Sequence, residues 1–280
     1  MKLLRYGSEG QERPGLLDSA GAIRDLSGVL KDITPDVLSD AALDKLRAID
    51  VESLPRVPGT PRLGMPVAGI RQCVAIGLNY RQHAIEAGMT IPSEPIIFFK
   101  AITSLTGPND PIVLPEKSEA TDWEIELTIV MGRLARSVPA ASAFDYVAGY
   151  TIANDVSERE WQLNRGGMWD KGKSFDTFCP LGPWLVTRDE IPDPQQLSLE
   201  LRVNGEVRQK SSTADMIFSV RELVAYCSRF MTLLPGDIIV TGTPQGVGWA
   251  MKPRQTLKAG DRVHLAIAAL GEQEQVVAAG

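Results

Sequence analysis

The sequence predicts a strand-rich α+β fold, and three observations support this class. From about residue 68 to the end of the 280-residue chain, short apolar runs recur between turn signals. Stretches with helical character are fewer and do not alternate regularly with these runs, as they would in a doubly wound fold. Asn204-Gly205 also separates two strand-like runs, which is typical of a two-residue hairpin turn.

The first 65 residues are predicted to form a small amino-terminal α/β domain. Strands are expected at 2–6, 14–18 and 22–26, followed by a helix around 41–49 that Asp40 would cap. Residues 55–62 contain three prolines, which cannot continue a helix or a central strand. We therefore expect a linker there and a larger domain at 66–280.

Most of the expected secondary structure lies in this larger domain. Apolar runs predict strands at 73–76, 96–99, 125–131, 147–154, 184–186, 197–203, 237–240 and 263–267. Helices are predicted at 80–87, 157–164 and 219–230. Ser157 and Glu160 have the spacing of a capping box, so the second helix is expected to begin directly after Asp155.

Composition and charge argue against several classes of partner. The net charge of −6, without a basic patch, disfavours nucleic acid and anionic membrane. No run approaches 18 apolar residues, and the amino terminus breaks after two leucines, so neither a membrane span nor a signal peptide is expected. Cys73, Cys179 and Cys227 are predicted to be buried, reduced thiols of a cytoplasmic protein, with a nucleophilic Cys179 as the alternative.

Three carboxylates, Glu124, Glu126 and Asp155, are the main candidates for function. Residues two apart on a strand point to the same side of a sheet, so Glu124 and Glu126 should project together, and Asp155 ends a second strand-like run. Like charges gathered on one face repel each other unless a positive charge lies between them, and oxygen ligands suit Mg²⁺ or Mn²⁺ better than Zn²⁺. The alternative is a solvated strand face, because the chain has 35 acidic residues.

Further polar side chains flank this group in the sequence. Arg159 and Gln162 are three apart and would share one helix face, which supplies a cation and an amide donor. Lys173 lies between a glycine and a short polar-aromatic run. Residues 237–248 form a strand that runs into a glycine-rich turn, which favours close backbone approach to a small ligand with the Thr243 hydroxyl as a contact. Surface positions are the alternative for Arg159 and Lys173.

His83 is one of only two histidines, and on a helix it would share a face with Glu86. An imidazole oriented by a carboxylate is a competent general base near neutral pH. A surface ion pair is the alternative for these two residues. His264 lies in an alternating strand and is expected to be structural.

Five motifs occur together in this chain. They are His83-x-x-Glu86, Asp122-Trp123-Glu124-x-Glu126, Asn154-Asp155-Val156-Ser157-x-Arg159-x-x-Gln162, Lys171-Gly172-Lys173-Ser174-Phe175-Asp176 and Thr241-Gly242-Thr243-Pro244-x-Gly246-Val247-Gly248. In this order they resemble the fumarylacetoacetate hydrolase family over residues 66–280. The resemblance implies a catalytic domain there with a mixed β-sandwich roll, usually in a homodimer.

The resemblance also implies roles for individual residues. The implied metal ligands, for Mg²⁺ or Mn²⁺, are Glu124, Glu126 and Asp155. The implied catalytic residues are His83 and Glu86, a base dyad on a lid, together with Lys173 and Gln162, which would stabilise oxyanions. The implied substrate-binding residues are Arg159, Thr243, Gly242 and Tyr80.

The activity that the resemblance implies is hydrolysis of a carbon–carbon bond in a 2,4-dioxo acid, with pyruvate as one product. The segment 165–173 is most similar to the bacterial branch that hydrolyses 2,4-diketo-3-deoxy-L-rhamnonate or L-fuconate to pyruvate and lactate. Oxaloacetate decarboxylase, hydroxymuconate-type isomerase and ureidoglycolate lyase are alternatives on the same scaffold, and a non-catalytic binding protein is another. Glu158 and Glu160 flank Arg159 where relatives often have a small residue and an aspartate, so a changed pocket rim is expected.

Overall fold

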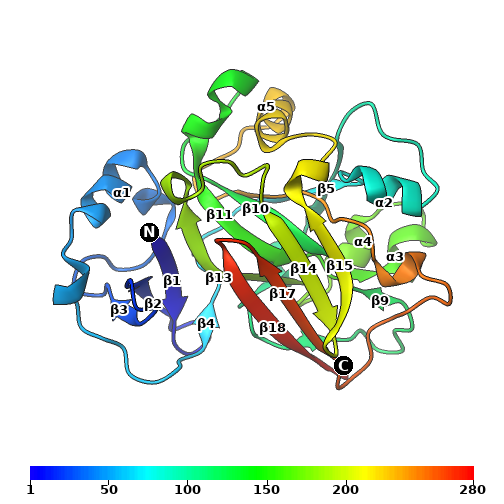
Figure 1. Ribbon diagram of the computed structural model, residues 1–280, viewed down its shortest axis with the longest axis horizontal. Helices are drawn as coiled ribbons and strands as arrows, with labels where there is room; N and C mark the ends of the chain where they lie inside the picture. The colour runs from blue at the N-terminus through cyan, green and yellow to red at the C-terminus, as the bar shows by residue number, and fades with distance from the viewer.

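Two β-sheets face each other across a shared hydrophobic core in this computed structural model, which describes residues 1–280 (Figure 1). In spatial order the larger sheet contains β3 (Ile23–Asp25), β2 (Arg13–Leu17), β1 (Lys2–Tyr6), β13 (Cys179–Thr187), β11 (Val147–Asn154), β10 (Ile125–Met131), β16 (Ile238–Val240), β5 (Cys73–Gly77) and β6 (Ile96–Lys100). Two short strands extend it, β4 (Leu63–Gly64) beside β1 and β7 (Leu105–Thr106) beside β13. The sheet is mixed, because β16 and β5 run parallel within an otherwise mainly antiparallel arrangement.

The smaller sheet packs on one face of the larger one. In order it contains β15 (Glu206–Ser212), β14 (Ser198–Val203), β17 (Arg262–Ile267), β18 (Gly271–Ala278) and β8 (Ile112–Val113). A separate two-stranded pair joins β9 (Thr121–Asp122) to β12 (Ser157–Glu158). The helices are α1 (Asp40–Arg47), α2 (Arg81–Glu86), α3 (Arg159–Leu163), α4 (Asp170–Lys173) and α5 (Val220–Phe230). These findings confirm the predicted strand-rich α+β class.

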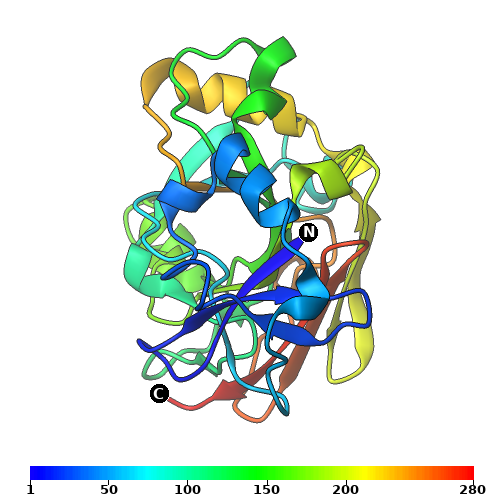
Figure 2. The ribbon, with the colours of Figure 1, turned by 90° about the vertical axis from the view of Figure 1, so that its left-hand side faces the viewer.

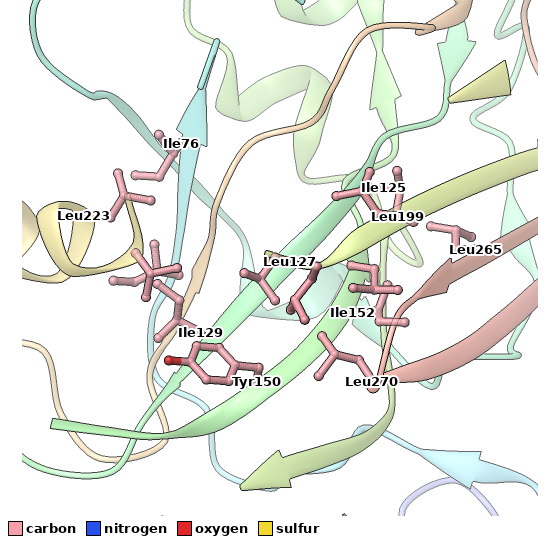
Figure 3. Packing of buried hydrophobic residues seen from close by; sticks show 14 of the residues in the cluster. Ile76, Ile125, Leu127, Ile129, Tyr150, Ile152, Leu199, Leu223, Leu265 and Leu270 are labelled. Carbon is pink, nitrogen blue, oxygen red and sulfur yellow. The ribbon is translucent and has the colours of Figure 1, made fainter. Parts of the chain in front are cut away.

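The main core lies between the two sheets. Leu127 of β10 and Ile152 of β11 point toward Leu199 of β14 and Leu265 of β17 (Figure 3). Because side chains alternate across a strand, Glu126 projects to the other side of β10 from Leu127. The same alternation that fills the core therefore places this carboxylate on the opposite face of the larger sheet.

The first 65 residues add strands to one edge of the larger sheet. β1 pairs antiparallel with β13, and Leu3 and Leu16 pack with Val130 and Leu185 in a second core cluster. Figure 2 shows these strands, in blue, on the side of the molecule that faces the viewer. The amino-terminal segment thus shares a sheet and a core with the rest, while its division from it at residue 65 stays a prediction.

Two predicted caps were wrong. The first helix is capped by Ser39, whose hydroxyl accepts from the Ala42 N–H at 3.3 Å, and Asp40 is instead its first residue. The helix predicted at 157–164 begins only at Arg159, because the backbone of Ser157 pairs with Asp122 in the β9–β12 ladder. The Ser157 hydroxyl donates to the carbonyl of Asp155 at 2.9 Å, so no capping box forms.

The Asn204-Gly205 hairpin was correctly predicted, whereas β18 was missed. Asn204 and Gly205 have φ values of 53° and 83°, as a type I′ turn requires. β18 carries glutamines at buried positions, and Gln273 donates to the carbonyls of Ile152 and Gly182 at 3.2 Å. A polar residue at an inward position removes the apolar alternation that signals a strand.

None of the helices combines the length and the apolar character needed to cross a membrane. Three of them, α2, α3 and α4, lie on the side of the molecule opposite the amino-terminal strands (Figure 1). Residues of all three helices line the same cavity as Glu124, which precedes β10, Glu126 of β10 and Asp155, which follows β11.

Candidate active site

The three predicted carboxylates converge. β10 and β11 pair antiparallel with Ile125 opposite Asn154, so Glu124 and Asp155 are neighbours at the same end, and the Asp155 N–H donates to the Glu124 carbonyl at 2.9 Å. One oxygen from each of Glu124, Glu126 and Asp155 lies within 4.8 Å of the others. All three side chains are buried. Strand pairing therefore brings together the group that the sequence singled out.

Three cations neutralise part of this cluster. The Lys173 ammonium lies 2.7 Å from Glu124 Oε2 and 2.6 Å from Asp155 Oδ2. The Arg159 guanidinium is 2.7 Å from Glu124 Oε1, and the Lys100 ammonium is 2.6 Å from Asp155 Oδ1. Glu124 and Asp155 thus each have two cationic neighbours.

Glu126 has no cationic partner. Its Oε2 accepts a hydrogen bond from the Gly242 N–H instead. Burial, together with repulsion from Asp155 and Glu124, raises the pKa of Glu126 well above its ordinary value. Burial alone would also raise the pKa of Glu124, but Lys173 and Arg159 outweigh it and hold that pKa at about 2.

The charges fit a divalent cation. With Asp122, which pairs with Arg159, the buried cluster has four carboxylates against the three cations, a net charge of −1. The uncompensated charge belongs to Glu126. A divalent ion among the three converging carboxylates would more than offset it and change the net charge of the cluster from −1 to +1, and a purely oxygen donor set suits Mg²⁺ or Mn²⁺.

Lys100 is a functional candidate that the sequence analysis missed. At the end of β6 it resembles a lysine that leaves an apolar strand for solvent, yet it is 2% exposed. Besides its ion pair with Asp155, its ammonium donates to the carbonyl of Lys173 and, at 3.4 Å, to that of Val156. It therefore joins a carboxylate of the cluster to the helix that carries Lys173.

We expect Lys100→Met to destabilise the metal-free protein by about 3 kcal/mol, because it breaks a buried ion pair and leaves Asp155 with Lys173 as its one remaining cation. A bound divalent ion would supply the missing positive charge. Thermal unfolding with and without Mn²⁺ should therefore show a larger metal-induced rise in Tm for Lys100→Met than for the wild type. Lys45→Met on the exposed face of α1 is the control, and equal rises in all three proteins would contradict the assignment.

Asp122 joins Arg159 to the backbone of residues 248–249. Its carboxylate accepts from the N–H groups of Gly248 at 2.7 Å and Trp249 at 3.0 Å, and from Arg159 Nε at 2.9 Å. Arg159 in turn donates through Nη1 to Gln162 Oε1 at 2.9 Å. Since the amide oxygen faces Arg159, the Nε2 donors of Gln162 stay available to a ligand.

His83 and Glu86 lie together on α2, as predicted. His83 Nδ1 is 3.5 Å from Glu86 Oε2. The Gly246 N–H donates to both oxygens of Glu86, at 3.1 and 3.0 Å, which ties α2 to the glycine-rich turn. With Nδ1 turned to the carboxylate, Nε2 remains available as a base.

The glycine-rich turn makes hydrogen bonds to Glu126 and to the backbone of β10. Gly242 has φ +96°, and a Cβ there would lie 2.7 Å from the Asn79 Cβ, so only glycine fits where the N–H reaches Glu126. The Thr243 side chain lines the cavity, but its hydroxyl donates to the Ile125 carbonyl at 3.0 Å. Tyr80 is fully buried and absent from the cavity wall. Gly242 and Tyr80 were predicted to bind substrate; neither lines the cavity, and substrate binding by them stays a prediction.

These side chains enclose a cavity of about 320 Å³. From the predicted set it is lined by His83, Glu86, Glu124, Glu126, Asp155, Arg159, Gln162, Lys173 and Thr243. Phe98, Trp169, Trp249 and Arg254 also line it, and the sequence analysis assigned none of them a role. They come from three separate segments of the chain, since only Trp249 and Arg254 are near each other, so no local pattern marks them as one wall.

Three sequence expectations about the rim and the thiols can now be compared with the structure. Glu158 and Glu160 were expected to change the pocket rim, but neither lines the cavity. Glu158 is 2% exposed and accepts from Thr121 at 2.8 Å, and Glu160 accepts from Asn164 at 2.6 Å. Both turn away because their partners lie outside the wall. The cysteines are free and buried, as expected, and Cys179 is not on the cavity wall either.

Comparison with known proteins gives matches over nearly the whole chain. The family described as fumarylacetoacetate (FAA) hydrolase C-terminal matches residues 72–278. A protein of Burkholderia orbicola (strain MC0-3) with a provisional hydrolase name is 58% identical over 276 residues, which cover 98% of each chain.

Two solved structures also resemble this fold closely. One is maleylpyruvate hydrolase from Sphingobium sp. SYK-6 in complex with manganese(II) and pyruvate, with 31% identity, TM-score 0.83 and full coverage of both chains. The other is 2-hydroxyhepta-2,4-diene-1,7-dioate isomerase from Mycobacterium marinum, with 35% identity and TM-score 0.79, covering 100% of this chain and 98% of that one.

Proposed function

The chain belongs to the fumarylacetoacetate hydrolase family, and from this premise we propose that it hydrolyses a carbon–carbon bond in a 2,4-dioxo acid of the acylpyruvate type. The observation that carries the proposal is the placement of a buried carboxylate triad and a His83–Glu86 pair on the walls of one cavity. The first suits a divalent ion, and the second suits activation of water. Hydrolysis of an acylpyruvate needs both.

Metal binding is part of the proposal. Glu124, Glu126 and Asp155 would hold Mg²⁺ or Mn²⁺, which supplies Lewis acidity at the 1-carboxylate and 2-oxo oxygens of the substrate. Lys173 pairs with Glu124 and Asp155, and Arg159 pairs with Glu124, which holds these two carboxylates in place. The manganese and pyruvate bound by the related maleylpyruvate hydrolase support this arrangement.

The residues of the chain then perform the proton and charge transfers. His83, oriented by Glu86, takes a proton from water through Nε2, and the hydroxide attacks the C4 carbonyl. Gln162 and Lys173 donate to the oxyanion that forms, contacts worth roughly 3–4 kcal/mol per donor in oxyanion holes. The C3–C4 bond then breaks, the acyl group leaves as a carboxylic acid, and C3 takes up the proton to give pyruvate.

Isomerisation or decarboxylation on the same site is the second candidate, since one structural relative is an isomerase. Oxaloacetate decarboxylation, hydroxymuconate-type isomerisation and ureidoglycolate cleavage would all use the carboxylate triad, and decarboxylation needs no base to activate water. A non-catalytic binding protein is a further candidate, which the absence of divalent-metal binding by calorimetry would favour.

The acyl group, the location and the assembly belong to the proposal as well. The segment 165–173 resembles the branch for 2,4-diketo-3-deoxy-L-rhamnonate and L-fuconate, whose acyl part would leave as lactate. The relatives act, by their names, on maleylpyruvate and on a heptadienedioate. A homodimer is proposed from the family resemblance alone, and a cytoplasmic location from the unpaired, buried cysteines.

A pyruvate-release assay tests the proposed function. We expect the protein with Mg²⁺ or Mn²⁺ to release pyruvate from 2,4-dioxo acids, and a chelator to reduce the rate at least 100-fold, because Lewis acidity contributes several kcal/mol. Oxaloacetate turnover should be measured in parallel with the same preparation. Turnover of oxaloacetate without any turnover of acylpyruvates would favour the decarboxylase, and chelator-resistant hydrolysis would contradict the metal site.

A further inference from the structure

Arg254 differs from every other charged residue on the cavity wall. The seven others, His83, Glu86, Glu124, Glu126, Asp155, Arg159 and Lys173, each make an ion pair or a hydrogen bond within the protein. Arg254 makes neither, and its guanidinium carbon lies 3.6 Å from the centroid of the Trp249 ring. It is the cation on this wall that remains free to bind an anion.

Stacking on Trp249 fixes the plane of the guanidinium without using its donors. The N–H groups lie in the guanidinium plane, so a stacked arginine keeps them available for a carboxylate, which it can bind through two parallel hydrogen bonds. The geometry is that of an arginine oriented before its ligand arrives.

The segment that carries Arg254 is anchored to the site. The Trp249 N–H donates to Asp122, the carboxylate that also binds Arg159. Beyond Arg254, the Gln255 N–H donates to the Gly248 carbonyl at 3.0 Å, and the Leu257 N–H to that of Thr121 at 2.8 Å. These contacts hold the segment that carries Arg254 in place relative to Asp122 and Arg159. A fixed position lowers the entropy lost when a ligand binds.

We propose that Arg254 binds a carboxylate at the far end of the acyl group, and that the site therefore selects acylpyruvates whose acyl group is itself acidic. This inference rests on the proposed function, which places the 1-carboxylate of the substrate at the metal ion held by the buried triad. Arg254 lines the same cavity but is solvent-exposed, so it would meet the other end of the substrate. A neutral hydroxylated acyl group, as in a sugar acid, would leave Arg254 without a partner.

Binding of uncleavable ligands tests this assignment separately from turnover. 2-Oxoheptanedioate and 2-oxoheptanoate have equal length, lack the 4-oxo group that hydrolysis requires, and differ only in the terminal carboxylate. Calorimetry on the Mn²⁺-loaded protein should show about tenfold tighter binding of the dioate, since one charge-assisted pair at a partly exposed site contributes modestly. Arg254→Gln should remove this preference and leave the affinity for 2-oxoheptanoate within twofold.

Lys252→Gln is the matched control, because it removes one positive charge from the same segment at an exposed residue that does not line the cavity. It should keep the preference for the dioate. Equal affinities for the two ligands in the wild type, binding of neither, or a preference that survives Arg254→Gln would overturn the role of Arg254. Failure of the proposed function shows elsewhere, as absence of pyruvate release from 2,4-dioxoheptanedioate and 2,4-dioxoheptanoate.

Discussion

Glutamine in place of Glu126 is expected to abolish divalent-metal binding and to make the metal-free protein more stable above neutral pH. Glu126 is 1% exposed and lacks a cation, so its charged form is unfavourable until a metal ion arrives. The neutral amide keeps the size of the side chain and removes the buried charge. It also removes the carboxylate that balances the ion, and metal-dependent turnover should fall at least 1,000-fold.

The pH dependence of this effect follows from the sign of the pKa shift. A carboxyl group whose pKa is raised by folding binds more protons in the folded than in the unfolded state. Its stabilising contribution is complete below the usual value of 4.5 and is lost as pH rises through the folded-state pKa of Glu126. The metal-free wild type should lose stability over that range, and Glu126→Gln should lose less.

Thermal unfolding across pH 5–9, with chelator and with Mn²⁺, measures both effects. Glu116→Gln, at an exposed glutamate, is the control and should follow the wild type. The assignment of Glu126 as a ligand is wrong if Mn²⁺ raises the Tm of Glu126→Gln as much as that of the wild type. A steeper loss of stability with pH in the variant would contradict the pKa argument.

The sequence predicted the parts of the site that depend on local periodicity. Glu124 and Glu126 follow the period of a strand, and His83 and Glu86 follow that of a helix, so their spacing alone predicts which side chains meet. Asp155 joins the two glutamates because strands 125–131 and 147–154 pair directly. Their predicted bounds agree with the structure, since both strands are continuous buried runs.

The sequence could not predict the parts that depend on contacts between distant segments. Lys100 reaches Asp155 across 55 positions of the chain, and Asp122 binds Arg159 across 37. Neither pair has a local signature, because a buried lysine and an exposed one look alike in sequence. Ser157 was misread for the same reason, since pairing with β9 outweighed its local preference for a cap.

Alanine in place of His83 should reduce hydrolysis of acylpyruvates by a factor of about 10²–10⁴, the usual contribution of a general base. The affinity for Mn²⁺ should change less than twofold, because the hydrogen-bond partner of His83 is Glu86 and not a triad carboxylate. Pyruvate should also still bind, since on the proposed function it would bind at the metal ligands and not at His83. The rates of pyruvate release and calorimetry with Mn²⁺ measure these quantities.

His264→Ala separates this effect from the mere loss of an imidazole. His264 lies on β17, where its ring is 3.3 Å from Glu272, and it is not on the cavity wall, so its removal should leave hydrolysis intact. Oxaloacetate gives the complementary result, because metal-assisted decarboxylation requires no activated water and any such activity should survive His83→Ala. Loss of both reactions in His83→Ala with metal binding intact would show that His83 positions the substrate. Loss of hydrolysis alone assigns the proton transfer to His83, because water is the one reactant that the two reactions do not share.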